Sequence, residues 1–264
     1  MLRAKEIADI FEQTTPVESG FLSDRKRRVL GFRFGNPEII IKGVGVAWYL
    51  SIEVIEQAIK RSLNLLLIHE PDLFYEDKSP WYTTLLPETS TVNLKKKQLL
   101  IENNICVYTA HSNWDLQKQV GNQPTFAKAL GLTEEIKRDI AVGVYRIQPM
   151  TFSDLIHKVK TATGLKHVRV QGDQNKLIKT VAVGFGNLGL AVDAILVNHA
   201  DAGIFGELCE FSFIAAREAN VAIIETTHLV SESIGFHSVV DVMKERVPEI
   251  KFEFLEVPFA YEWV

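Results

Sequence analysis

Short apolar runs of β-type residues alternate with helix-like segments along most of this 264-residue chain. The β-type runs are apolar at successive positions rather than at every second one, which indicates strands buried on both faces of a sheet. Such strands need helices on both sides, so the alternation predicts an α/β protein. The predicted strands cover residues 38–48, 64–70, 104–111, 139–147, 167–172, 179–186, 221–228 and 251–257.

Helical patterns occupy most of the intervals between these strands. They cover residues 4–13, 51–62, 93–104, 124–131, 151–164, 207–220 and 237–247. Ser51 and Thr151 each precede a helical pattern with an acid in its first turn, which is typical of N-cap residues. Residues 74–93 contain two prolines and many hydroxyls without a clear period, so we expect a long loop there.

Composition narrows the class of protein. Apolar residues make up 47% and charged residues 23% of the chain, as in soluble globular proteins. The net charge of −4 gives no basic excess for nucleic acid, and no apolar run reaches the roughly 18 residues of a membrane span. The first residues form an amphipathic pattern with acids rather than a signal peptide. With only Cys106 and Cys209, a disulfide framework is excluded and we expect a cytoplasmic protein.

Three of the predicted strands end with an imidazole followed by a carboxylate. The residues are His69 with Glu70, His111 with Asp115, and His228 with Glu232. Because ligands gather at the carboxyl ends of strands in α/β sheets, up to six metal-ligating side chains would meet there. Imidazole nitrogen and carboxylate oxygen suit zinc, manganese, iron, cobalt or nickel. Carboxylates can also bridge two ions about 3.5–4 Å apart, which together activate one water.

The His-x-x-x-acid spacing is weak evidence by itself. With 33 acids among 264 residues, each of 7 histidines has about a one-in-eight chance of an acid four positions on, so roughly one accidental pair is expected. His237 and Asp241 form such a pair inside a predicted helix, and we interpret them as a surface pair. The coincidence of the other pairs with strand ends is what favours a metal site. A helical turn after the strand would put both members on one face.

At these residues the sequence resembles the Nif-three-like dinuclear metal-centre family, many members of which are named GTP cyclohydrolase one type two homologue. The family's strand ending His-His-Pro is matched by residues 69–71, and its Ala-His-Thr-Asn-Leu-Asp by residues 110–115. Its Asp-x-x-x-x-Gly-Glu is matched by residues 201–207, and its Gly-His-x-x-x-Glu by residues 227–232. The resemblance extends over residues 38–257.

The resemblance implies two similar α/β domains with mixed sheets flanked by helices, and a metal site in the cleft between them. We assign residues 1–132 plus 226–264 to the first domain and residues 133–225 to the second. It also implies a ring-shaped homohexamer and two divalent metal ions per chain. The implied metal ligands are His69, Glu70, Asp115, His228 and Glu232. His111 would lie close by and orient a ligand or carry a proton, and the candidate catalytic residues are His111 and Glu232.

Two departures mark a divergent member of that family. Glu70 stands where the family has a second histidine. A carboxylate there still ligates, but it adds negative charge and favours a harder ion such as manganese or iron over zinc. The family's N-terminal Trp-Asp-Asn-x-Gly segment is missing, and residues 18–50 contain other residues in its place.

Several other features have competing interpretations. Residues 184–189, Gly-Phe-Gly-Asn-Leu-Gly, fit a dinucleotide-binding pattern after a strand, but Asp201 starts a separate segment instead of closing a second strand. We therefore favour a glycine turn at a strand–helix junction. Glu207 and Glu225 are candidate partners that orient His228 or another ligand. Trp114 either packs over the site or belongs to the core.

These features favour a metal-dependent hydrolase with a small-molecule substrate, which the family name suggests is a nucleotide. Ring opening of a purine nucleotide and phosphoester hydrolysis both fit a site with activated water. Either His111 or Glu232 would move the proton. The alternative is a non-catalytic metal-binding scaffold or a regulatory interaction protein.

Overall fold

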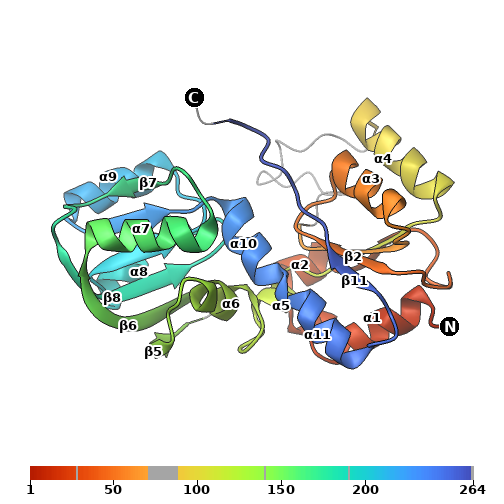
Figure 1. Cartoon of the computed structure of the whole chain (residues 1–264), viewed down its shortest axis with the longest axis horizontal. Coiled ribbons are helices and arrows are strands. Elements are labelled where there is room, and N and C mark those ends of the chain that lie inside the picture. Colours follow the sequence, from red (N-terminus) through yellow and green to blue (C-terminus); the bar gives the residue numbers. More distant parts are fainter. Residues whose placement is uncertain (28, 71–88, 140, 190, 263–264) are drawn as a thin grey trace. The chain divides into compact units, whose positions relative to one another are not determined.

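The structure, a computed structural model, describes residues 1–27, 29–70, 89–139, 141–189 and 191–262 (Figure 1). These residues form two compact units. Unit 1 consists of residues 1–117 and 236–262, and unit 2 of residues 118–235. The predicted fold class is confirmed, because each unit contains a mixed sheet flanked by helices. The predicted division into domains stays a prediction, since compactness alone does not show which segments fold together.

Unit 1 is built around one five-stranded sheet. Its strands are β1 (Gly31–Phe34), β2 (Val44–Ala47), β3 (Leu65–Ile68), β4 (Cys106–Thr109) and β11 (Phe252–Phe254). Its helices are α1 (Ala4–Glu12), the short 3-10 helix η1 (Val17–Ser19), α2 (Leu22–Arg27), α3 (Ile52–Lys60), α4 (Thr91–Glu102), α5 (Ser112–Asp115) and α11 (Ser238–Arg246). The strand order is β1-β4-β3-β2-β11, with only β1 antiparallel to its neighbour.

Helices cover both faces of this sheet, as its continuously apolar strands require. On one face, Leu66 and Val107 pack with residues of α3 and α4 in one apolar cluster. On the other face, the ring of Tyr108 meets Phe11 of α1 edge-on, with ring centroids 5.9 Å apart. All four residues of β3 and of β4 are buried.

The register between β3 and β4 positions the ends of both strands. Ile68 pairs with Thr109, and the backbone N–H of Ala110 donates to the carbonyl of Ile68 at 2.9 Å. His69 and His111 therefore leave the sheet at the same edge, one residue beyond Ile68 and two residues beyond Thr109. This adjacency follows from the parallel pairing of two short strands.

Unit 2 is built around a six-stranded sheet. Its strands are β5 (Glu134–Arg138), β6 (Val142–Thr151), β7 (Arg169–Gln171), β8 (Leu177–Gly184), β9 (Ala202–Phe205) and β10 (Ala222–Glu225). Its helices are α6 (Asn122–Ala129), α7 (Phe152–Thr163), α8 (Ala191–Val197) and α9 (Glu210–Glu218), while α10 (His228–Phe236) ends at the first residue of the second segment of unit 1. The order is β5-β6-β8-β9-β10-β7, and β8, β9 and β10 are mutually parallel.

Two separate apolar clusters lie on the two faces of the unit 2 sheet. One contains Phe152, Leu155 and Val159 of α7, which lies across the strands in Figure 1. The other contains Ile195 of α8 and Ala216 of α9. The carboxyl ends of β8, β9 and β10 lead to Gly186, Glu207 and His228.

Several local predictions can be compared with the structure. Ser51 and Thr151 are confirmed as N-caps, since their side chains accept hydrogen bonds from the backbone N–H groups of Val54 and Asp154. Most of the predicted loop at 74–93 lies outside the described residues, as does Pro71, and residues 91–93 begin α4. None of the helices in the described part of the chain combines the length and the apolar character needed to cross a membrane.

Candidate metal centre

Three histidines share one hydrogen-bonding pattern. The Nδ1 atom of His69 lies 3.0 Å from the carbonyl oxygen of Ala110. The Nδ1 atom of His111 lies 2.8 Å from Oδ2 of Asp24, and that of His228 lies 3.1 Å from Oε2 of Glu207. Because each of these oxygens is an acceptor, Nδ1 carries the proton. With Nδ1 directed at an oxygen in each ring, Nε2 is the nitrogen that would coordinate a metal, the arrangement usual for metal-binding histidines.

The first cluster of candidate ligands lies in unit 1. His69 is fully buried, and its Nε2 lies 3.6 Å from Oδ1 of Asp115, which is also buried. Potential ligand atoms of His69, Glu70 and His111 all lie within 4.8 Å of one another. His69 and Glu70 directly follow β3 and His111 follows β4, as the sequence predicted, while Asp115 is the last residue of the short helix α5. A divalent cation would relieve the repulsion between the two carboxylates.

An aromatic wall stands behind His69. The ring of Phe236 lies 4.9 Å from the His69 ring, and Trp114 meets Phe236 edge-on at 6.2 Å. Trp114 also stacks on Phe11 at 5.7 Å and is fully buried. Of the two interpretations of Trp114, the core role is the one that these contacts support. The apolar wall lowers the local dielectric, which strengthens electrostatic interactions at the cluster.

Asp24 is the site residue that the sequence analysis missed. Its Oδ2 accepts hydrogen bonds from both His111 and the hydroxyl of Ser112. Ser112 Oγ in turn accepts from the backbone N–H of Phe21 at 2.9 Å, which ties the segment carrying Asp24 to α5. Asp24 is buried, so its charge is held by these partners rather than by water.

The electrostatics of the pair favour its charged form. Burial lowers the pKa of His111, but the hydrogen bond to Asp24 and the negative charges of Glu70 and Asp115 outweigh this and raise its pKa to about 10. Burial likewise raises the pKa of Asp24, yet the hydrogen bond and charge of His111 hold it below its ordinary value of 3.8. Without a bound cation, His111 is therefore the positive counter-ion of the cluster.

The second cluster lies in unit 2 at the start of α10. His228 and Glu232 are one helical turn apart, and Nε2 of His228 lies 2.9 Å from Oε2 of Glu232. Glu232 is buried while His228 is partly exposed. The hydrogen bond from His228 holds the pKa of Glu207 below its usual value despite partial burial. The predicted i,i+4 geometry of His228 and Glu232 is thus present.

The glycine-rich turn at 184–189 packs against this second cluster. Gly186 has φ of +60°, and a Cβ atom placed on it would lie 2.2 Å from Oε1 of Glu232. Its N–H donates to Oγ of Ser231 at 3.1 Å, and its carbonyl accepts from the N–H of Glu207 at 2.7 Å. The turn connects β8 to α8 as expected, and its glycine leaves room for the carboxylate.

Two other acids have structural roles. Oδ2 of Asp201 accepts from the backbone N–H groups of Lys179 and Thr180 at 2.8 and 2.9 Å, so it joins the strand β8 to the loop before β9. Glu225 accepts from the N–H of Leu208 at 3.2 Å and pairs with Arg169. Of the two predicted partners of His228, Glu207 therefore makes the contact, while Glu225 bonds to Leu208 and Arg169 instead.

The structure thus gathers His69, Glu70, His111 and Asp115 in unit 1, and His228 and Glu232 in unit 2. Each group combines imidazole nitrogen with carboxylate oxygen, a donor set that fits divalent transition metals. His157, His167 and His199 are exposed and belong to no candidate metal group among the described residues. The assignment of individual ligands and of catalytic roles stays a prediction.

The fold and the two clusters of histidines and acids together define a two-unit α/β protein with candidate metal-binding groups near its strand ends. The family Duf34/NIF3 (NGG1p interacting factor 3) matches residues 2–260, and the chain belongs to this family.

Relatives and a solved structure agree with this assignment. A protein of Clostridium perfringens named GTP cyclohydrolase 1 type 2 homolog is 29% identical over 93% of this chain and 93% of its own length. One of the same name from Clostridium acetobutylicum is 28% identical over 88% of this chain and 85% of its own. The crystal structure of a Bacillus cereus protein related to NIF3 covers 100% of this chain and 99% of its own, with a TM-score of 0.85 at 16% identity. That identity shows a shared fold alone.

Proposed function

We propose that this chain is a metal-dependent hydrolase with two divalent ions, held by His69, Glu70, Asp115, His228 and Glu232. The observation that carries the proposal is the shared orientation of three histidines. Each has Nδ1 engaged by an oxygen acceptor, and the Nε2 atoms of His69 and His228 lie beside buried carboxylates. Structural core histidines need no such uniform arrangement.

The donor set bears on the identity of the ions. Carboxylates outnumber imidazoles among the proposed ligands, and Glu70 replaces a histidine of the family pattern. Oxygen donors favour harder ions, so manganese or iron is preferred over zinc. The buried position of His69 and Asp115 raises the cost of leaving the carboxylates without a cation.

The chain's own groups supply the proton chemistry. Bound ions of this kind polarise a substrate oxygen and lower the pKa of a coordinated water towards neutrality. His111, whose Nδ1 is hydrogen-bonded to Asp24, would donate a proton from Nε2 and take it back. Glu232, whose Oε2 contacts His228, is the corresponding group of the second cluster. Asp24 fixes the ring and supports its positive charge, as a carboxylate does behind a catalytic histidine.

The substrate is proposed from the relatives' names. GTP cyclohydrolase 1 type 2 homologs suggest a purine nucleotide, whose ring opening needs activated water and proton transfer. Phosphoester hydrolysis likewise needs an activated water and a group that transfers a proton. From the family resemblance, we extend the proposal to a homohexamer, which light scattering tests directly.

A non-catalytic role has support of its own. The family's description names an interacting factor rather than an enzyme. In that role the ions would stabilise the fold, and the assembled chain would act as a scaffold for regulatory partners.

Elemental analysis after loading with Mn²⁺, Fe²⁺ or Zn²⁺ tests the site. We expect about two ions per chain, and loss of metal in His69→Ala, Asp115→Ala and Glu232→Ala. His157→Ala, which removes an exposed histidine of α7, is the matched control. Metal content that is unchanged across all four variants contradicts the site.

Turnover by the metal-loaded protein separates the enzyme from the scaffold. GTP, bis(p-nitrophenyl) phosphate and p-nitrophenyl phosphate sample ring opening, diester and monoester hydrolysis. Hydrolysis that is lost in Asp115→Ala with the fold intact supports the enzyme. Two bound ions with no turnover of any of these substrates favour the scaffold.

A further inference from the structure

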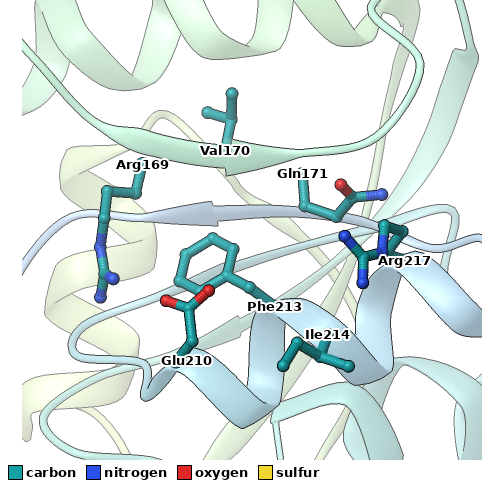
Figure 2. A pocket seen from close by; sticks show the side chains of 7 residues that line it. All are labelled: Arg169, Val170, Gln171, Glu210, Phe213, Ile214 and Arg217. Carbon is teal, nitrogen blue, oxygen red and sulfur yellow. The ribbon is translucent and has the colours of Figure 1, made fainter.

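A groove runs along the edge of the unit 2 sheet, between β7 and α9 (Figure 2). Its volume is about 360 Å³. β7 is the last strand of the sheet order, and it pairs with β10 on one side only among the described residues. The groove is lined by Arg169, Val170, Gln171, Glu210, Phe213, Ile214 and Arg217. It lies outside the candidate metal clusters.

One face of α9 supplies the floor of the groove. Glu210, Phe213, Ile214 and Arg217 recur at helical spacing, so all four face β7. At 1.5 Å per residue, the acid and the base are separated by about 10 Å along the helix axis. Figure 2 shows the two apolar side chains between them. The groove therefore has Glu210 at one end, where Arg169 also lies, an apolar middle, and Arg217 at the other end.

The apolar middle is held in place by Arg169. The Arg169 guanidinium stacks over the Phe213 ring at 4.7 Å, donates to the carbonyl of Leu208 at 2.6 Å and pairs with the buried carboxylate of Glu225. Its charge is thus matched within unit 2, and Phe213 has a fixed partner on one face. A fixed aromatic floor lowers the entropy lost when a ligand binds.

The polar groups at the two ends are not matched. The side chains of Gln171, Glu210 and Arg217 make no hydrogen bond or ion pair in the part of the chain that the structure describes. The Arg217 end combines the guanidinium of this residue with the amide of Gln171, which suits a carboxylate. The Glu210 end offers a single carboxylate, which suits an ammonium or guanidinium group.

We infer that this groove binds an extended peptide segment of a partner protein, which adds to the sheet beside β7. Side chains on one face of a strand recur every second residue, so positions i and i+4 are about 13 Å apart. Flexible charged side chains at these positions reach groups 10 Å apart, as Glu210 and Arg217 are. The matching segment is base–x–apolar–x–acid or its reverse, with the apolar residue over Phe213 and Ile214.

Both the open strand edge and the charges select this occupant. An exposed edge presents unpaired backbone N–H and C=O groups, and an added strand forms hydrogen bonds with them. Pockets beside the edge then bind every second side chain of the added strand, which gives specificity. The edge is short, because β7 ends at Gln171 and Gly172 turns away with φ of +134°. A segment of about five residues fills the groove, which excludes a long strand exchange.

Fluorescence anisotropy with two labelled peptides tests the inference. They contain Lys-Thr-Val-Thr-Glu and the reversed Glu-Thr-Val-Thr-Lys between serine residues. One of them should bind the wild-type protein, and Arg217→Glu should weaken this binding at least about tenfold. Replacing the peptide's glutamate by lysine should restore binding to Arg217→Glu. Lys244→Glu, an exposed charge reversal on α11 of unit 1, should leave the affinity unchanged.

Three results would overturn the inference. The first is no binding of either peptide up to about 1 mM. The second is equal affinity of the wild-type protein and Arg217→Glu for the same peptide. The third is a change in molecular mass by light scattering in Arg217→Glu, because a second copy of the chain would then occupy the groove. Arg217 is exposed, so the variant should keep the wild-type melting temperature, which circular dichroism verifies.

Discussion

Asp24 and His111 are hydrogen-bonded at 2.8 Å although 87 residues separate them in the chain. The bond orients the His111 ring, since the Asp24 carboxylate accepts from Nδ1–H. It also brings the N-terminal segment to the candidate metal centre, where the family's own N-terminal pattern is missing.

Removing the Asp24 carboxylate should lower the pKa of His111. In protein stripped of metal with EDTA, we expect that pKa to fall from about 10 towards its ordinary value of 6.5 in Asp24→Asn, because the hydrogen bond to Asp24 is the largest contribution that raises it. Long-range ¹H–¹⁵N spectra of the histidine side chains measure the titration. An identical titration in the wild type and the variant would show that the bond does not form in solution.

The same pair predicts how stability depends on pH. The raised pKa of His111 contributes stability that is present below 6.5 and lost as the pH rises through about 10. The lowered pKa of Asp24 contributes stability above 3.8 that is lost as the pH falls through its folded value. Urea unfolding of the metal-free protein should therefore show a larger cost of Asp24→Asn at pH 6 than at pH 10. An equal cost at both pH values would contradict the pairing.

Two of the three strand ends were predictable because their signal is local. β3 and β4 are continuous apolar runs, and each is followed at once by a histidine. Parallel pairing of such runs then brings the histidines to one edge. The helix that carries His228 was only partly predictable, because Thr226 and Thr227 extend the strand-like pattern of β10 up to it.

Other elements gave no signal that a sequence pattern detects. β5, Glu-Glu-Ile-Lys-Arg, is polar and exposed, and its partner β6 holds it through backbone pairing rather than burial. β1 is half-buried and β9 is too short for a period. Asp24 lies in a short charged helix. Its hydrogen bonds to His111 and Ser112 join residues that are far apart in the sequence, so no local pattern predicts them.

Gly186→Ala should destabilise unit 2. The new Cβ would meet Glu232 Oε1, and the φ of +60° is strained for alanine, so we expect a cost of about 1–3 kcal/mol in the free energy of unfolding. Urea unfolding measures the cost. Gly189→Ala, in the same turn but with no atom within 4 Å of its Cβ, should change stability by less. Equal effects of both substitutions would disprove the packing of Gly186 on Glu232.

Thr227→Gly should leave the protein as stable as the wild type or slightly more stable. Thr227 has φ of +76°, a conformation that costs a β-branched residue about 1–2 kcal/mol, and glycine occupies this place in the family pattern. The substitution loses the hydroxyl that caps the N–H of Val230, worth a few tenths of a kcal/mol when glycine replaces it. Thr227→Ala keeps the strain and loses the cap. Melting temperatures should therefore rank Gly above Ala, and the reverse order would refute the strain.

The two cysteines should differ sharply in reactivity with iodoacetamide. Burial raises the pKa of Cys106 to about 12, so at pH 8 only about one molecule in 10⁴ carries the reactive thiolate, and its Sγ donates to the carbonyl of Phe34. Cys209 is exposed, and its hydrogen bonds with Ser212 hold its pKa below the usual value. Intact-mass measurement should find one adduct on the native protein and two in guanidinium chloride. Cys209→Ser should abolish the native adduct, whereas rapid native labelling of Cys106 would mean that β4 opens to solvent.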